Sequence, residues 1–258
     1  MTSMRTFRVR RQAPAWLAAG LLMASGAVRV AAEESPVESA TKVLAEALTT
    51  DVEGVRLDAA ELAARLSTPG LEPAARTLAA SPDRFERSLA LELLARIDVA
   101  RNRDLFEQAM TAPFRSVRVR AVLALSTLRE PGVVRPLAAM LAEDRDPDLR
   151  ALAAKGLGAV GGQDARSALR RALVDAHPLV QTAAVEGLVA TGDHEVGFDL
   201  VARVRGVPPV EACRLLGLVA LVPERELIPQ LTELLASPAP IVRVAAAAAI
   251  LRIDERTR

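Results

Sequence analysis

The chain is poor in the residues that most catalytic and nucleic-acid-binding sites need. Among its 258 residues there is no tyrosine, and there are one tryptophan, one cysteine and two histidines. An aromatic content of 2% disfavours a surface on which nucleic-acid bases stack. The single cysteine, Cys213, excludes an intramolecular disulfide. We expect its thiol to be buried beside Leu215 and Leu216, because free cysteines are among the most buried residues.

The first 32 residues have the plan of a secretory signal peptide. Four arginines lie between residues 5 and 11, an uncharged run of 16 residues covers 13–28, and small residues at 30–32 precede two glutamates. This order of basic, apolar and small residues predicts a cleaved signal peptide over 1–32 and a periplasmic or secreted location. The run is shorter than the roughly 20 residues that span a membrane. An uncleaved anchor or an ordinary first helix is the alternative.

Removal of the signal peptide changes the charge of the chain. Five of the 33 basic residues lie in 1–32 and no acidic ones do, so 28 basic residues remain against 32 acidic ones, a net charge of −4. A mildly acidic protein has no general attraction for a phosphate backbone. We therefore expect no nucleic-acid partner, and since no second long apolar run follows, no membrane span in the mature chain.

Apolar residues make up 51% of the chain, and most are alanine, leucine and valine, which indicates an all-α protein. Residues 146–173 show the pattern of one helical hairpin. Asp146-Pro147 is a helix start, and Leu149, Leu152, Ala153 and Leu157 then follow at helical spacing. Gly161-Gly162 ends the helix before a second, shorter one. Such a hairpin cannot bury its apolar face alone and needs neighbours of the same kind.

The chain supplies these neighbours as a repeat. A signature of an apolar and then a polar residue recurs at intervals of 30 to 32, at Val55-Arg56, Phe85-Glu86, Val117-Arg118, Leu149-Arg150, Val180-Gln181, Val210-Glu211 and Val242-Arg243. This period predicts an α-solenoid of about seven helical hairpins over 33–258. The expected helix pairs are 35–49 with 54–66, 71–80 with 83–96, 101–111 with 115–128, 133–142 with 147–160, 163–174 with 178–190, 194–205 with 208–221, and 224–236 with 239–253, followed by a frayed tail.

The repeat resembles the HEAT repeat, in the short bacterial variety first named from phycobilisome lyases. The residues that carry the resemblance are Asp146 to Arg150, Ala153-Ala154, Gly156-Leu157-Gly158 and Gly161. They are echoed around Val117, Val180 and Val242. The resemblance implies a right-handed α–α superhelix that serves as a binding scaffold, with enzymes or enzyme subunits as a minority of such proteins.

Arginine occupies the polar signature position in four units, at Arg56, Arg118, Arg150 and Arg243. These side chains could form an anion-binding stripe or a structural ladder in which each arginine pairs with an acidic residue of the preceding turn. Because Glu86, Gln181 and Glu211 interrupt the series, we favour the ladder.

The two histidines, His177 and His194, lie in turns before helices and are 17 residues apart. This spacing does not suit metal ligands on one helix, so helix capping is the better interpretation. No Ser–His–Asp or Cys–His group has a motif context. We therefore expect no catalytic residues, metal or cofactor.

The second helices should leave one face free. We number the apolar signature residue as position one of each second helix. Positions three and seven then lie close to one stripe along the surface of that helix. The residues assigned there as a protein-binding face are Val119, Leu123, Lys155, Thr182, Glu186 and Leu216. In solenoids of this kind the second helices line the concave side. The alternative is that this register is wrong and the positions pack between units.

We predict an exported scaffold that binds another protein of unknown identity through the concave second-helix surface, without catalysis. A chromophore-lyase-like enzyme or enzyme subunit, and a self-associating spacer, are the alternatives. The last helix, 239–253, is apolar nearly all round, with only Arg243 and Arg252 as polar residues in 241–253. It either presents alanines to water or forms an interface, for a second copy as a homodimer or for the partner.

Overall fold

The computed structural model describes residues 35–258; the expected signal peptide and its cleavage site lie outside the described residues. The chain divides into two compact units, one ending at Ile97 and the other beginning at Asp98. Fourteen α-helices, labelled α2 to α15, account for the regular structure together with short 3₁₀ turns, and no strand occurs in the part described. The all-α prediction is therefore confirmed.

The unit that ends at Ile97 holds two helical hairpins. They are formed by α2 (Pro36–Leu48) with α3 (Glu53–Ala63) and by α4 (Glu72–Leu78) with α5 (Arg84–Ile97). Helix α2 begins with a capping box, in which the Ser35 hydroxyl accepts from the N–H of Glu38 and the Glu38 carboxylate accepts from the N–H of Ser35. α3 packs against α5 as well as against α2.

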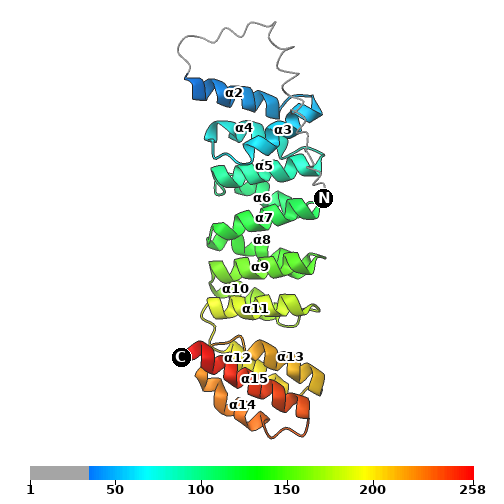
Figure 1. The fold of residues 1–258 in the computed structure, drawn as a ribbon, viewed down its shortest axis with the longest axis vertical. Coiled ribbons are helices and arrows are strands. Elements are labelled where there is room, and N and C mark those ends of the chain that lie inside the picture. Colours follow the sequence, from blue (N-terminus) through cyan, green and yellow to red (C-terminus); the bar gives the residue numbers. More distant parts are fainter. Residues whose placement is uncertain (1–34) are drawn as a thin grey trace, which may run out of the picture. The chain divides into compact units, whose positions relative to one another are not determined.

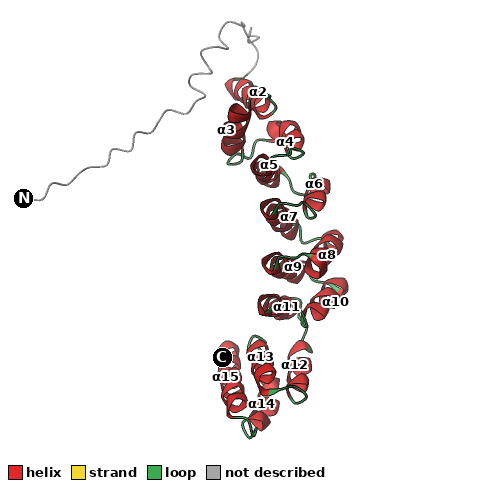
Figure 2. Ribbon diagram, turned by 90° about the vertical axis from the view of Figure 1, so that its right-hand side faces the viewer, coloured by secondary structure: helices red, strands yellow, loops and turns green. Residues whose placement is uncertain are grey.

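The second unit holds five further hairpins. Their helices are α6 (Arg103–Ala109) and α7 (Arg115–Thr127), α8 (Val134–Glu143) and α9 (Pro147–Val160), α10 (Gln163–Ala172) and α11 (Pro178–Ala190), α12 (Val196–Val204) and α13 (Pro209–Val219), and α14 (Ile228–Leu234) and α15 (Pro240–Thr257). Within this unit α7, α9 and α11 form one layer and α8 and α10 the other (Figures 1 and 2). The seven hairpins of the prediction are confirmed.

Helix α9 shows how the sequence produces one repeat. The Asp146 carboxylate caps the helix by accepting from the N–H of Asp148, and Pro147 occupies the first turn. Gly161, with a φ of 74°, ends the helix in a conformation that residues with a Cβ adopt rarely. Leu149 and Leu157 are buried between these ends, as their spacing predicts.

Neighbouring second helices approach each other closely at glycine. A Cβ placed on Gly158 of α9 would lie 2.6 Å from the Cα of Gly187 in α11. The two glycines therefore allow the backbones of α9 and α11 to pack without an intervening side chain.

The predicted frayed tail is wrong. Helix α15 continues to Thr257 because polar contacts hold its last turn. The Asp254 carboxylate accepts from Arg225 at 2.8 Å, and Arg256 donates to the carbonyl oxygen of Leu221 at 2.8 Å.

The signature register is also wrong in two units. The helices that begin at Pro147, Pro178, Pro209 and Pro240 place Glu211, not Val210, at the position of Leu149 and Val180. Val210 is 77% exposed. In α5 the same shift puts Glu86, which is buried, at position one, and leaves Phe85 57% exposed. The corrected signature recurs every 31 residues with one interval of 32.

None of the helices between residues 35 and 258 combines the length and the apolar character that a membrane crossing requires.

Candidate protein-binding face and its arginine ladder

The signature arginines tie each repeat to the next. Arg118 of α7 donates from Nε to the Asp144 carboxylate at 2.7 Å, and Arg150 of α9 donates to Asp175 at 2.8 and 2.9 Å. In each case the acid lies in the turn before the second helix of the following repeat. Arg56 pairs in the same direction with Glu86 at 2.7 Å.

The same arginines also hold their own repeat. The Nη1 group of Arg150 donates to the backbone carbonyl of Asp144, six residues earlier, at 2.9 Å. The corresponding carbonyl contacts are made by Arg56 at 2.8 Å, Arg118 at 3.0 Å, Gln181 at 2.5 Å and Arg243 at 2.8 Å. In these five repeats position two thus fastens the turn before its helix, whether it carries arginine or glutamine.

The ladder of the sequence prediction exists, but its direction is corrected. The preceding turn supplies a carbonyl oxygen, and the carboxylate comes from the following repeat. The hydrogen bond from Arg150 holds the pKa of Asp175 below its ordinary value, and the same bond raises the pKa of Arg150. The guanidinium groups of Arg118 and Arg150 are therefore paired within the fold and do not form an anion-binding stripe.

Position seven of the second helices is exposed throughout the second unit. Leu123, with 45% of its surface exposed, Lys155 and Glu186 lie there, followed by Gly217 and Ala248. A Cβ on Gly217 would meet open space. Position three is less accessible, since Val119 and Thr182 are only half-buried and Ala151 is 4% exposed. Position seven therefore marks the free face, and position three lies partly at the boundary between repeats.

Leu216 does not belong to this face. It is fully buried, because the register in α13 is one residue later than the sequence prediction placed it. One residue turns a helix by about 100°, which moves Leu216 into the core and brings Gly217 to the surface. Cys213, expected to be buried, lies at position three of the corrected register and is half-buried.

The residue before each signature adds apolar surface that the sequence prediction missed. Leu179 is 41% exposed, Val210 77% and Ile241 52%. Val210 was counted as a buried signature residue. The spacing from proline could have revealed this error. Pro178 and Pro240 each lie two residues before their signature residue, whereas Pro209 lies directly before Val210.

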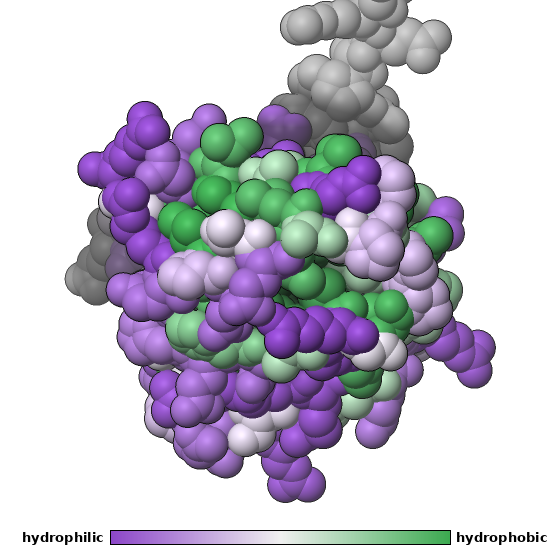
Figure 3. All heavy atoms as spheres, turned by 90° about the horizontal axis from the view of Figure 1, so that it is seen from below, coloured by the Kyte–Doolittle hydropathy of each residue, from purple (hydrophilic) through white to green (hydrophobic). Residues whose placement is uncertain are grey.

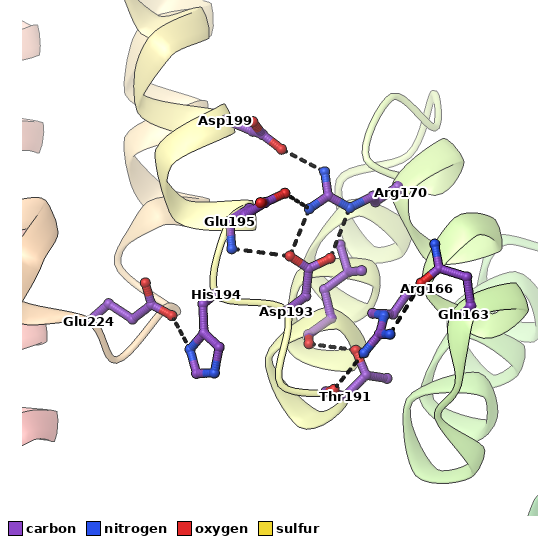
Figure 4. A network of polar contacts seen from close by, with 10 residues as sticks. Gln163, Arg166, Arg170, Thr191, Asp193, His194, Glu195, Asp199 and Glu224 are labelled. Atoms are coloured by element: carbon purple, nitrogen blue, oxygen red, sulfur yellow. Dashed lines mark hydrogen bonds and ion pairs between the residues drawn. The ribbon is translucent and has the colours of Figure 1, made fainter.

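A second polar cluster joins the first helices α10 and α12 (Figure 4). Arg170 of α10 points toward α12, where it donates to Asp193 in the turn before that helix at 2.7 Å and to Asp199 within the helix at 2.6 Å. The hydrogen bond with Asp193 raises the pKa of Arg170 above its ordinary value. Because Asp193 is buried, this cluster fixes the turn by pairing a charge that could not otherwise be accommodated.

The histidines lie in the turns where the sequence places them. The His177 ring caps α11 by accepting from the N–H of Leu179 at 3.3 Å. His194 is 84% exposed and contacts Glu224 at 2.9 Å, so it does not cap α12. Within residues 35–258 no three His, Cys, Asp or Glu side chains gather in a way that could hold a metal ion.

An open groove of about 660 Å³ lies between the first helices α6 and α8. Met110, Pro136 and Met140 contribute apolar surface to it, and the paired Arg118 and Asp144 lie at one end. Two of the charged residues that line the groove, Arg118 and Asp144, are thus already paired in the ladder.

A comparison against known families agrees with this architecture of repeated helical hairpins. A model described as HEAT repeats matches residues 68–151 and 134–210, more than half of the chain. The chain belongs to the HEAT-repeat family. No curated protein sequence matches it.

Solved structures share the fold of these HEAT repeats at low sequence identity. The E. coli protein YibA is 15% identical, with a TM-score of 0.56, over 91% of this chain and 85% of YibA. The complex of CpcE and CpcF of phycocyanin lyase from Nostoc sp. PCC7120 is 15% identical, with a TM-score of 0.50, over 84% of this chain and 93% of that one. At such identities the likeness concerns the fold alone.

Proposed function

We propose that this HEAT-repeat protein is an exported scaffold that binds another protein through the free face of its second helices. The observation that carries the proposal is the exposure of position seven along the second unit, with Leu123, Lys155 and Glu186 in successive repeats. The docking would use shape and contact, with no bond chemistry.

The chemistry of the face favours a protein partner. Exposed Leu179, Val210 and Ile241 supply aliphatic surface, while Lys155 and Glu186 offer charges of opposite sign. Mixed aliphatic and charged surface of this kind suits a protein interface, in which an apolar core is ringed by polar groups. A phosphate backbone would instead require a row of free cations, and Arg118 and Arg150 are paired.

The chromophore-lyase alternative is supported only by the family resemblance and by a fold likeness at 15% identity. Neither observation places reactive groups in this chain, so we do not propose it.

The experiment is affinity capture from the host with the wild-type protein and a Leu123→Asp, Lys155→Glu double variant. A matched control carries Arg135→Glu, an exposed residue of the first helix α8. We expect a protein that the wild type and the control retain and the double variant loses. The same set of proteins on all three baits would reject this face as the binding site.

A further inference from the structure

The second helices contact their following neighbour through positions three and ten. In α9 these are Ala151, which is 4% exposed, and Gly158, which packs on Gly187 of α11. Both positions are buried or half-buried in every second helix from α3 to α13. In α15 they hold Val244, 70% exposed, and Leu251, 65% exposed. Figure 3, the view from below Figure 1, shows green apolar patches between polar residues on the surface of the second unit.

The ladder is also open at this end. Arg243 occupies the position of Arg118 and Arg150, and like them it donates to the carbonyl oxygen six residues earlier, here Ser237 at 2.8 Å. Its other contact is the carbonyl of Pro238 at 3.4 Å. Across residues 35–258 no carboxylate pairs with it. The α14–α15 repeat therefore presents both components of the repeat-to-repeat contact, the apolar positions and the guanidinium, and no other repeat within residues 35–258 covers them.

The first hairpin, α2–α3, has the complementary features. Position eight faces the preceding repeat, as the close contact of Gly156 with Ser126 shows. This position is buried in all six later second helices, at Leu93, Ala124, Gly156, Gly187, Leu218 and Ala249. In α3 it is Leu62, which is 53% exposed. The turn before α3 carries the exposed Asp51. Along the chain, Asp51 is one residue closer to position one of its helix than Asp144 and Asp175 are to position one of theirs.

We propose that the α2–α3 hairpin of a second copy stacks on α15, in the place that an eighth repeat would occupy. Leu62 of that copy covers the apolar surface of Val244 and Leu251, and its Asp51 accepts from Arg243. The contact continues the interface that already joins the repeats within the chain. Because it joins two different surfaces it is heterologous, and repetition of it extends the assembly head to tail.

This arrangement differs from a dimer in which two α15 helices pair with each other. A tail-to-tail pair would also cover Val244 and Leu251. In such a pair, however, the carboxylates brought near Arg243 would come from the last turn of α15, where Asp254 is already paired with Arg225 and Arg258, and not from the turn before a second helix as at Arg118 and Arg150. The open ladder position therefore favours a hairpin with an acidic turn. The contact involves neither Leu123, Lys155 nor Glu186, so its failure would leave the proposed function untouched.

Two variants that each block one end distinguish these arrangements. The tail variant carries Val244→Glu and Leu251→Glu, and the head variant carries Leu62→Glu; all three side chains are exposed, so the fold should survive and circular dichroism checks this. In sedimentation velocity at tens of micromolar we expect a concentration-dependent series of oligomers from the wild type, monomers from either variant alone, and dimers from their equimolar mixture.

Other outcomes overturn the proposal. A monomeric wild type excludes self-association at this end, and a head variant that still dimerises shows a tail-to-tail pair. A charge exchange gives a second readout: Arg243→Asp should weaken assembly about tenfold, and addition of Asp51→Arg should restore it. A double variant that assembles no better than Arg243→Asp alone would show that these two residues do not pair.

Discussion

At the scale of single residues, Leu157 and Lys155 differ in burial although they are two positions apart on α9. Leu157 is fully buried and Lys155 is exposed. We expect Leu157→Ala to lower the free energy of unfolding by about 2–5 kcal/mol, because it leaves a cavity between hairpins. Lys155→Ala should change it by less than about 0.5 kcal/mol. Equal denaturant midpoints for the two variants would contradict this assignment of the helix faces.

The Arg150–Asp175 pair makes stability depend on pH. The pKa of Asp175 is lowered in the folded protein, chiefly by the hydrogen bond from Arg150, so the unfolded chain binds the proton more tightly. The contribution of the pair is fully present above the ordinary aspartate pKa of about 3.9 and is lost as the pH falls through the folded value.

Asp175→Asn should accordingly lower the free energy of unfolding by about 2 kcal/mol at pH 7. The difference from the wild type should shrink below about pH 4, where the aspartate carboxylate of the unfolded chain begins to bind a proton. Urea unfolding of both proteins from pH 3 to pH 7 measures it. Asp148→Asn is the control, because Asp148 is 62% exposed in its pair with Arg115 and exposed pairs contribute little. A difference that is constant across this pH range would contradict the role of Asp175.

At the scale of the element, the spacing between α9 and α11 depends on Gly158. A side chain there would collide with the backbone at Gly187, 2.6 Å from the new Cβ. We expect Gly158→Val to destabilise the protein by about 1–3 kcal/mol, because the two helices must separate. Ala159→Val, one residue later on an exposed position, introduces the same β-branched side chain and should cost less than about 0.5 kcal/mol. Thermal unfolding of the two variants measures the difference, and similar Tm values would show that the helix pair can adjust.

At the scale of the whole molecule, the basic, apolar and small residues of 1–32 make export a prediction. We expect the native protein to begin at or near Glu33 and to be found outside the cytoplasm. Mass spectrometry of the protein isolated from cell fractions measures both. Intact residues 1–32 on a cytosolic protein would contradict the signal peptide and, with it, the exported part of the proposed function.

The sequence by itself determined the helices and their repetition. The cap at Asp146-Pro147, the stop at Gly161-Gly162 and the spacing of Leu149 and Leu157 act within one hairpin, so they can be read without knowledge of distant contacts. A hairpin of this kind must pack on copies of itself, and the period of about 31 residues therefore determined the solenoid as well.

The tertiary structure alone decided how each repeat meets the next. The partner of Arg150 is Asp175, 25 residues later, and no local rule selects it over the acids nearby. The register of α13 depends on how that helix packs against α12 and α15. The local apolar–polar pattern points to Val210 as position one, whereas the packed helix places Glu211 there. Since one residue turns a helix by about 100°, this choice determined that Leu216 lies in the core and Gly217 on the free face.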